Sequence, residues 1–130
     1  MSRKLRAKSW AAYGITPWRK REIMSWCRQY PDWKEELQYG LRSVSMNGGS
    51  HGSNIGRPTE QQAIHNAELQ DKILLVEHAV HEVCPQIETA MLNNIGYGIP
   101  YAYLQVPCSD RDFYSLRIAV YALISERRKS

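Results

Sequence analysis

The chain has 130 residues and a formal net charge of +4, and 43% of its residues are hydrophobic. This length and hydrophobic content suffice for one hydrophobic core and argue against a second independent domain. Its three cysteines, Cys27, Cys84 and Cys108, have no paired spacing, and no apolar run approaches 18 residues. The cysteines argue against a secreted disulfide framework, and the lack of a long apolar run argues against a signal peptide and a membrane span. We therefore expect a protein of the reducing cytoplasm.

Charge is distributed unevenly along the chain. Residues 1–21 hold seven basic and no acidic residues, whereas residues 58–95 hold six acidic residues and a single lysine. This charge distribution predicts that the ends of the chain contact a polyanion, while its middle packs in the core or contacts another protein. We expect residues 1–15 to form a basic arm that either tracks phosphates or serves as a solvated tail. Its candidate phosphate contacts are Arg3, Lys4, Arg6 and Lys8.

An N-terminal helical segment is predicted over residues 16–42. Thr16 is a suitable N-cap and Pro17 a suitable first helical residue, so a helix should run from there toward Tyr30. Pro31 then forces a kink or a new helix start, which Asp32 would favour. Residues 43–57 are rich in glycine and serine, and we expect a flexible loop there.

A larger helical domain is predicted over residues 58–130. Thr59 and Gln62 form a capping box that opens a long helix ending near Val83. An apolar seam along this helix indicates either a core helix or a homo-oligomer formed through the 59–83 helix. The seam consists of Leu69, Ile73, Val76, Val80 and Val83. A second helix is expected from Pro85 to about Asn94.

The region from about residue 85 to 128 has the order of a helix-turn-helix. Pro100 opens a short helix over residues 101–104, residues 106–108 make a tight turn, and Ser109 with Asp112 caps a longer final helix. With no convincing strand pattern elsewhere, the predicted fold class is all-α, a helical bundle with a C-terminal helix-turn-helix.

Helical spacing divides the final helix into two faces. The inward face should carry Phe113, Leu116, Val120, Leu123 and Ile124. The face opposite, which a DNA major groove would meet, should carry Arg111, Tyr114, Ser115, Ile118 and Ala122. Further contacts to DNA are expected from Arg117, Arg127, Arg128 and Lys129. An alternative is that Tyr114, Ile118 and Tyr121 form an outward apolar stripe for a protein partner.

The motif VPCSDRDFYSLR, followed by an aliphatic and aromatic run with a basic end, resembles phage-encoded transcriptional regulators of the RinA and ArpU kind. The upstream order YPDWKEEL, a gap, GRPT and a long helix is also similar. The resemblance implies a helix-turn-helix like region 4 of sigma-70 factors. It also implies double-stranded DNA as a partner, RNA polymerase as a second candidate partner, and action on late genes in the cytoplasm of a bacterial host. Relatives often place basic residues where this chain has Ser115, Ile118 and Ala119, and its Asp110 and Asp112 at the helix start oppose phosphate contact.

Enzymatic chemistry has little support in the sequence. His78, His81 and Cys84, with His51 or His65 as a fourth ligand, could in principle hold zinc, but no Cys-x-x-Cys or His-Glu-x-x-His motif accompanies them. The glycine-rich loop lacks the ending of a P-loop. We therefore expect no catalytic residues, metal or cofactor.

The four tryptophans, Trp10, Trp18, Trp26 and Trp33, are spaced so that they would lie on one packed side of a helix.

These observations predict a phage or prophage DNA-binding transcriptional regulator that acts through its helix-turn-helix. Two alternatives remain open at the level of sequence. A small terminase subunit also joins a helix-turn-helix to helical oligomerisation, but it packages DNA as a ring. A helical adaptor would bind protein without binding DNA. Solution mass separates the first from a regulator, and a DNA-binding assay separates the second.

Overall fold

The structure, a computed structural model, describes residues 9–47 and 59–129. All regular elements in these two ranges are helical, which confirms the all-α prediction; none of their helices could cross a membrane. The predicted basic arm up to Lys8 and the glycine-rich part of the predicted loop, residues 48–57, lie outside the described residues. The elements are η1 (Ala11–Tyr13), α1 (Pro17–Cys27), α2 (Tyr30–Asn47), α3 (Glu60–Val83), η3 (Pro85–Ile87), α4 (Glu88–Ile95), η4 (Tyr101–Tyr103) and α5 (Asp110–Arg128).

Side-chain caps fix the starts of α1, α3 and α5. In each case the hydroxyl oxygen of the N-cap accepts a hydrogen bond from the backbone N–H three residues later, which satisfies one of the free donors of the first turn. The pairs are Thr16 with Arg19, Thr59 with Gln62, and Ser109 with Asp112. All three predicted helix starts are thereby confirmed.

The helix ends differ in places from the sequence prediction. The break before Pro31 is confirmed, since α1 ends at Cys27 and α2 begins at Tyr30. Helix α2 continues to Asn47, past the position where a loop was expected to begin. The single helix predicted from Pro85 is instead a 3-10 turn followed by α4, because Ile87 has φ −125° and ψ 32°, outside the helical region.

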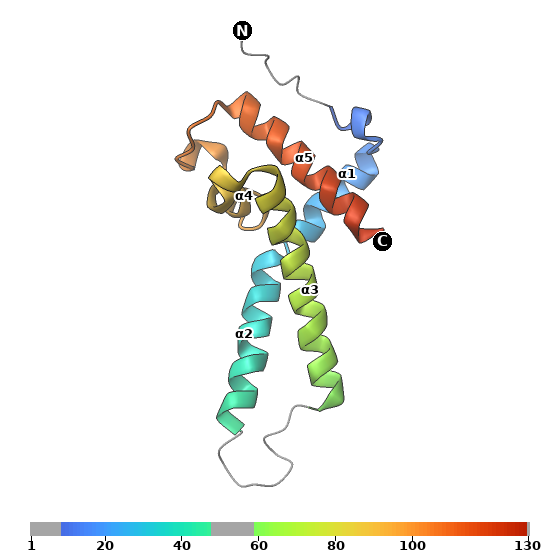
Figure 1. Ribbon diagram of the computed structural model, residues 1–130, viewed down its shortest axis with the longest axis vertical. Coiled ribbons are helices and arrows are strands. Elements are labelled where there is room, and N and C mark those ends of the chain that lie inside the picture. Colours follow the sequence, from blue (N-terminus) through green and yellow to red (C-terminus); the bar gives the residue numbers. More distant parts are fainter. Residues whose placement is uncertain (1–8, 48–58, 130) are drawn as a thin grey trace.

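Helix α3 runs through most of the length of the molecule (Figure 1). Its N-terminal half packs along α2, and α4 and α5 pack against the rest, with α1 lying against α5 (Figure 1). The structure therefore has a body, made of α1, α4, α5 and the C-terminal half of α3. A projecting helix pair, consisting of α2 and residues 59–72, extends away from this body (Figure 1).

The core lies where α3 meets α1, α4 and α5. Side chains with no exposed surface come from all four helices and include Ile23, Val76, Val80, Met91, Ile95, Phe113, Val120 and Ile124. Leu69 and Ile73 of the predicted seam are also buried, and Val83 packs at the core edge. The seam is therefore covered within one chain, which confirms the core interpretation, and its buried positions are not free to form a dimer interface.

Two cysteines are part of this core. Burial raises the pKa of the Cys27 thiol to about 12 and that of the Cys84 thiol to about 11. Both therefore remain protonated at neutral pH, and a thiol is a poor nucleophile and metal ligand compared with a thiolate. These residues serve as small apolar side chains, not as reactive groups.

Candidate nucleic-acid interface

The inward face of α5 is placed as the helical spacing predicted. Phe113, Val120 and Ile124 are fully buried, while Leu116 and Leu123 are half-buried and pack against the core. Phe113 contacts the ring of Tyr101, with the ring centroids 5.3 Å apart. The hydroxyl of Tyr101 donates a hydrogen bond to the backbone carbonyl of Cys108. Together these contacts fix η4 against the turn that precedes α5.

The predicted outward apolar stripe of Tyr114, Ile118 and Tyr121 is wrong at Tyr121, which is only 1% exposed. Trp10 stacks on the Tyr121 ring at a centroid distance of 5.5 Å, and the amino group of Lys20 lies over Trp10. Burial also raises the pKa of the Tyr121 hydroxyl. A helical wheel describes one helix alone, so it could not show that a residue more than 100 positions earlier covers this side chain.

The predicted groove-facing residues are less exposed than expected. Arg111 is exposed, as are its neighbours Asp110 and Asp112, whereas Tyr114, Ser115, Ile118 and Ala122 are half-buried. The only exposed residue of this predicted face is therefore in the first turn of α5, which holds two carboxylates and one guanidinium. The free N–H groups of a helix start attract anions, and the two carboxylates reduce that attraction.

Arg117 occupies a position between polar and aromatic partners. Its guanidinium carbon lies 4.5 Å from the centroid of the Tyr114 ring, and one Nη atom donates to Asn94 Oδ1 at 3.3 Å. Asn94 in turn donates to the carbonyl of Ile99 at 3.0 Å. Neither Arg117 nor Arg111 forms an ion pair with a carboxylate of residues 9–41 or 59–129.

Arg28 is a candidate contact that the sequence analysis missed. It follows α1, it is exposed, and it has no acidic partner within the described part of the chain. Its guanidinium lies against Gly98, where a Cβ atom would approach Arg28 Nη2 to 2.3 Å and where φ is +74°. Arg28 and Arg117 both lower the pKa of Tyr121, although burial outweighs them, so both cations lie near its hydroxyl. In the sequence, a single arginine after a helix has no feature that identifies it as a candidate contact.

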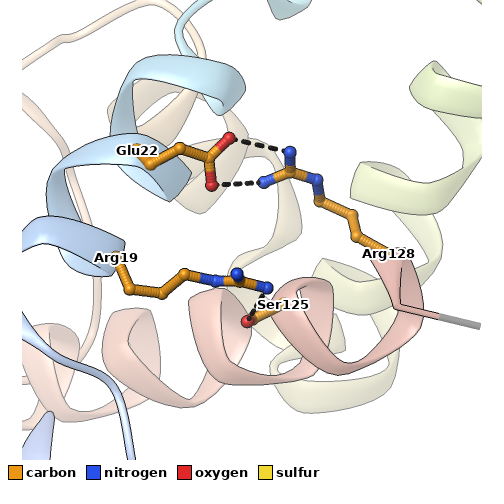
Figure 2. Close-up of polar contacts among 4 residues, drawn as sticks. All are labelled: Arg19, Glu22, Ser125 and Arg128. Atoms are coloured by element: carbon orange, nitrogen blue, oxygen red, sulfur yellow. Dashed lines mark hydrogen bonds and ion pairs between the residues drawn. The ribbon is translucent and has the colours of Figure 1, made fainter.

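The basic end of α5, in contrast, is largely neutralised. Arg127 donates from one Nη atom to both carboxylate oxygens of Glu82, at 2.7 and 2.8 Å, and Arg128 forms a bidentate ion pair with Glu22 at 2.7 and 2.9 Å. Figure 2 shows the second pair beside the hydrogen bond from Arg19 to Ser125, both joining α1 to α5. These two arginines, predicted to contact DNA, bind carboxylates of their own chain. Lys129 remains exposed and without a carboxylate partner in the described ranges.

The pair of Glu22 and Arg128 leads to a prediction about pH. Hydrogen bonding to Arg128 lowers the pKa of Glu22, so its contribution to stability is present above the unfolded-state pKa of about 4.3 and is lost as pH falls through the lower folded-state value. Because the carboxylate is half exposed, Glu22→Gln should lower the free energy of unfolding by only about 0.5 kcal/mol at pH 7. Urea denaturation should show no difference at about pH 2.

The matched control is Glu126→Gln, because Glu126 is exposed and has no basic partner among the described side chains. It should leave the free energy of unfolding unchanged at both pH values. An equal effect of the two substitutions would show that the Arg128 pair contributes nothing specific.

The histidines and Cys84 are not assembled as metal ligands. His81 Nδ1 lies 2.7 Å from Glu88 Oε1, His65 contacts Glu36, and Cys84 is buried. No set of three histidine, cysteine or acidic side chains within residues 9–41 and 59–129 is arranged to hold a metal ion. His51 lies outside the described residues.

The tryptophan prediction is wrong at one position. Trp33 is buried and Trp10 and Trp26 are half-buried, but Trp18 is 76% exposed. Its ring is covered on one side by the guanidinium of Arg21 at 5.1 Å. Trp18 lies in the first turn of α1.

Residues 96–109, which lead from α4 to α5, contain one helical turn, η4, instead of a full first helix of a helix-turn-helix. Two hydrogen bonds nevertheless hold this segment in place: the Asn94 side chain donates to the carbonyl of Ile99, and the Tyr101 hydroxyl donates to the carbonyl of Cys108.

Comparisons of the chain with protein families, with curated proteins and with solved structures returned no match.

Proposed function

We propose that this protein is a phage or prophage transcriptional regulator that binds double-stranded DNA, with α4, the η4 turn and α5 acting as its helix-turn-helix, similar to region 4 of sigma-70 factors. The proposal rests on the resemblance of the C-terminal motif to RinA and ArpU regulators and on the surface around Tyr114. DNA binding requires cations that their own chain has not neutralised.

One observation carries the assignment: the cations of α5 without a carboxylate partner in the described ranges include Arg111 and Arg117, whereas Arg127 and Arg128 are paired. Arg111 and Arg117 lie three residues before and three residues after Tyr114, so they flank its ring on the helix. Guanidinium groups bind phosphates and the edge of guanine well. We therefore assign DNA contact to Arg111, Tyr114 and Arg117, with Ser115 and Ile118 beside them and Arg28 as an additional phosphate contact.

The two carboxylates of the first turn limit how much α5 can contribute alone. Asp110 and Asp112 are exposed beside Arg111, and they repel phosphates. Additional attraction is assigned to the N-terminal arm, whose Arg3, Lys4, Arg6 and Lys8 would follow the DNA backbone. Binding should consequently depend steeply on salt concentration.

The test begins with selection of bound fragments from phage genomic DNA, followed by fluorescence anisotropy on the selected duplex. The double variant Arg111→Gln with Arg117→Gln should weaken binding by about 10- to 100-fold and reduce the slope of log affinity against log salt by about 2. The matched control is Arg127→Gln with Arg128→Gln, which removes the same charge from the same helix and should change affinity far less.

The outcomes separate the candidate functions. Equal loss in both double variants would show that only net charge matters, which would contradict the assigned surface. Wild-type protein that binds no duplex at low salt would contradict the regulator and leave the adaptor function. Specific DNA binding by a ring of about eight or more subunits would instead indicate a role in packaging.

A further inference from the structure

A groove lies between the start of α1 and the end of α5, separate from the surface around Tyr114. Its volume is about 700 Å³, and we call it the α1/α5 groove. We call its apolar lining the floor; its polar lining, of similar extent, includes the cations Arg19 and Lys129 against one carboxylate, that of Glu126. The apolar lining includes Ile15, Val83, Ala119, Ala122 and Leu123.

The cations of this groove are incompletely satisfied. Arg19 donates to Ser125 at 3.3 Å, but its Nε atom is buried and has no hydrogen-bond partner in the described structure (Figure 2). Lys129 is exposed and lacks a carboxylate partner in the same ranges. An apolar floor between two such cations suits a surface that presents an apolar or aromatic group flanked by carboxylates.

The projecting helix pair presents a surface of that kind. Four exposed residues follow one another on α2 at the spacing i, i+3, i+4, i+7, which places them on one face; we call them the α2 stripe. They are Asp32, Glu35, Glu36 and Tyr39, of which Glu36 also contacts His65 of α3. Tyr39 is 72% exposed, and Ile64 and Leu41 on the same helix pair are 52% and 54% exposed. These three side chains give the projecting helix pair an exposed apolar part.

Charge decides what can cover the stripe. The projecting helix pair carries six acidic residues and three basic ones, a charge balance that repels nucleic acid and favours a basic partner surface. The body around the groove is basic, since α1 carries Arg19, Lys20 and Arg21 with Glu22 as its acidic residue. The α2 stripe and the α1/α5 groove are thus complementary both in charge and in having an exposed apolar part.

The two surfaces cannot meet within one molecule. The projecting helix pair extends away from α1 and from the C-terminal end of α5 (Figure 1), and its two helices are packed along each other. A second copy of the chain carries the complementary surface. We propose that the α2 stripe of one copy docks in the α1/α5 groove of a second copy, with Tyr39 on the apolar floor and Glu35 and Glu36 near Arg19 and Lys129.

This contact joins two different patches, so it can close as a reciprocal dimer or continue around a ring. It also reassigns Lys129 from DNA contact to self-association. The groove does not include Arg111, Tyr114 or Arg117. Self-association and DNA binding can consequently be tested separately, and the failure of one leaves the other standing.

Sedimentation velocity of the full chain tests the proposal through a charge exchange. The stripe variant carries Glu35→Lys and Glu36→Lys, and the groove variant carries Arg19→Glu and Lys129→Glu. Wild type should associate at low salt and dissociate at high salt. Each variant alone should associate about 100-fold more weakly, because like charges then face each other across the contact. An equimolar mixture should recover association, because both new contacts join opposite charges.

The matched control is Glu68→Lys with Asp71→Lys, which makes the same charge change on exposed positions of α3 outside the stripe. It should associate as wild type does. Circular dichroism checks each fold, and Lys129→Glu alone replaces the groove variant if Arg19→Glu unfolds the chain. A wild type that stays monomeric at low salt, a mixture that does not recover, or a control that fails as the stripe variant does would each overturn the proposal.

Discussion

Phe113→Ala is expected to lower the free energy of unfolding by about 3 to 5 kcal/mol, because it removes a fully buried ring and leaves a cavity between α5 and η4. The lost contacts include the Tyr101 ring at 5.3 Å and the Tyr114 ring at 5.6 Å. The same truncation should loosen the region that we assign to DNA contact. Urea denaturation followed by circular dichroism measures the change.

Tyr103→Ala is the matched control for this substitution. Tyr103 is an aromatic residue of η4, the element that Phe113 holds in place through Tyr101, but it is 80% exposed. Its truncation should change the free energy of unfolding by no more than about 0.5 kcal/mol. Similar losses for the two variants would mean that α5 is not anchored through Phe113.

Trp33→Ala is expected to have an effect of similar size, about 3 to 5 kcal/mol on the free energy of unfolding. Trp33 is 4% exposed near the start of α2, and its ring meets Trp26 of α1 edge-on at a centroid distance of 4.7 Å. The amino group of Lys72 from α3 lies 5.6 Å from the same ring. This side chain therefore ties the projecting helix pair to α1, and its loss should weaken both.

Trp18→Ala removes the same side chain from an exposed position and serves as the control. Its main contact is the guanidinium of Arg21, worth at most about 1 kcal/mol at an exposed site. Thermal unfolding should therefore give a clear fall in melting temperature for Trp33→Ala and a small one for Trp18→Ala. Equal falls would contradict the packing of Trp33 between the helices.

Helix caps and the buried seam of α3 could be read from the sequence because they depend on residues a few positions apart. Ser109 caps α5 through a group three residues later, and the seam residues recur once per helical turn. Helical periodicity also predicted where the candidate site residues lie along α5. It could not predict how exposed they are, because exposure depends on which other segments pack against the helix.

Contacts between distant segments account for the differences. Trp10 covers Tyr121, and Glu22 binds Arg128 from 106 positions away. Neither partner is indicated by local spacing, since periodicity describes only one helix at a time. The sequence by itself thus determined that the chain is helical, where α1, α3 and α5 begin and which stripe of α3 is buried. Only the tertiary structure decided which cations remain unpaired, because ion pairing and burial are set by residues that folding brings together.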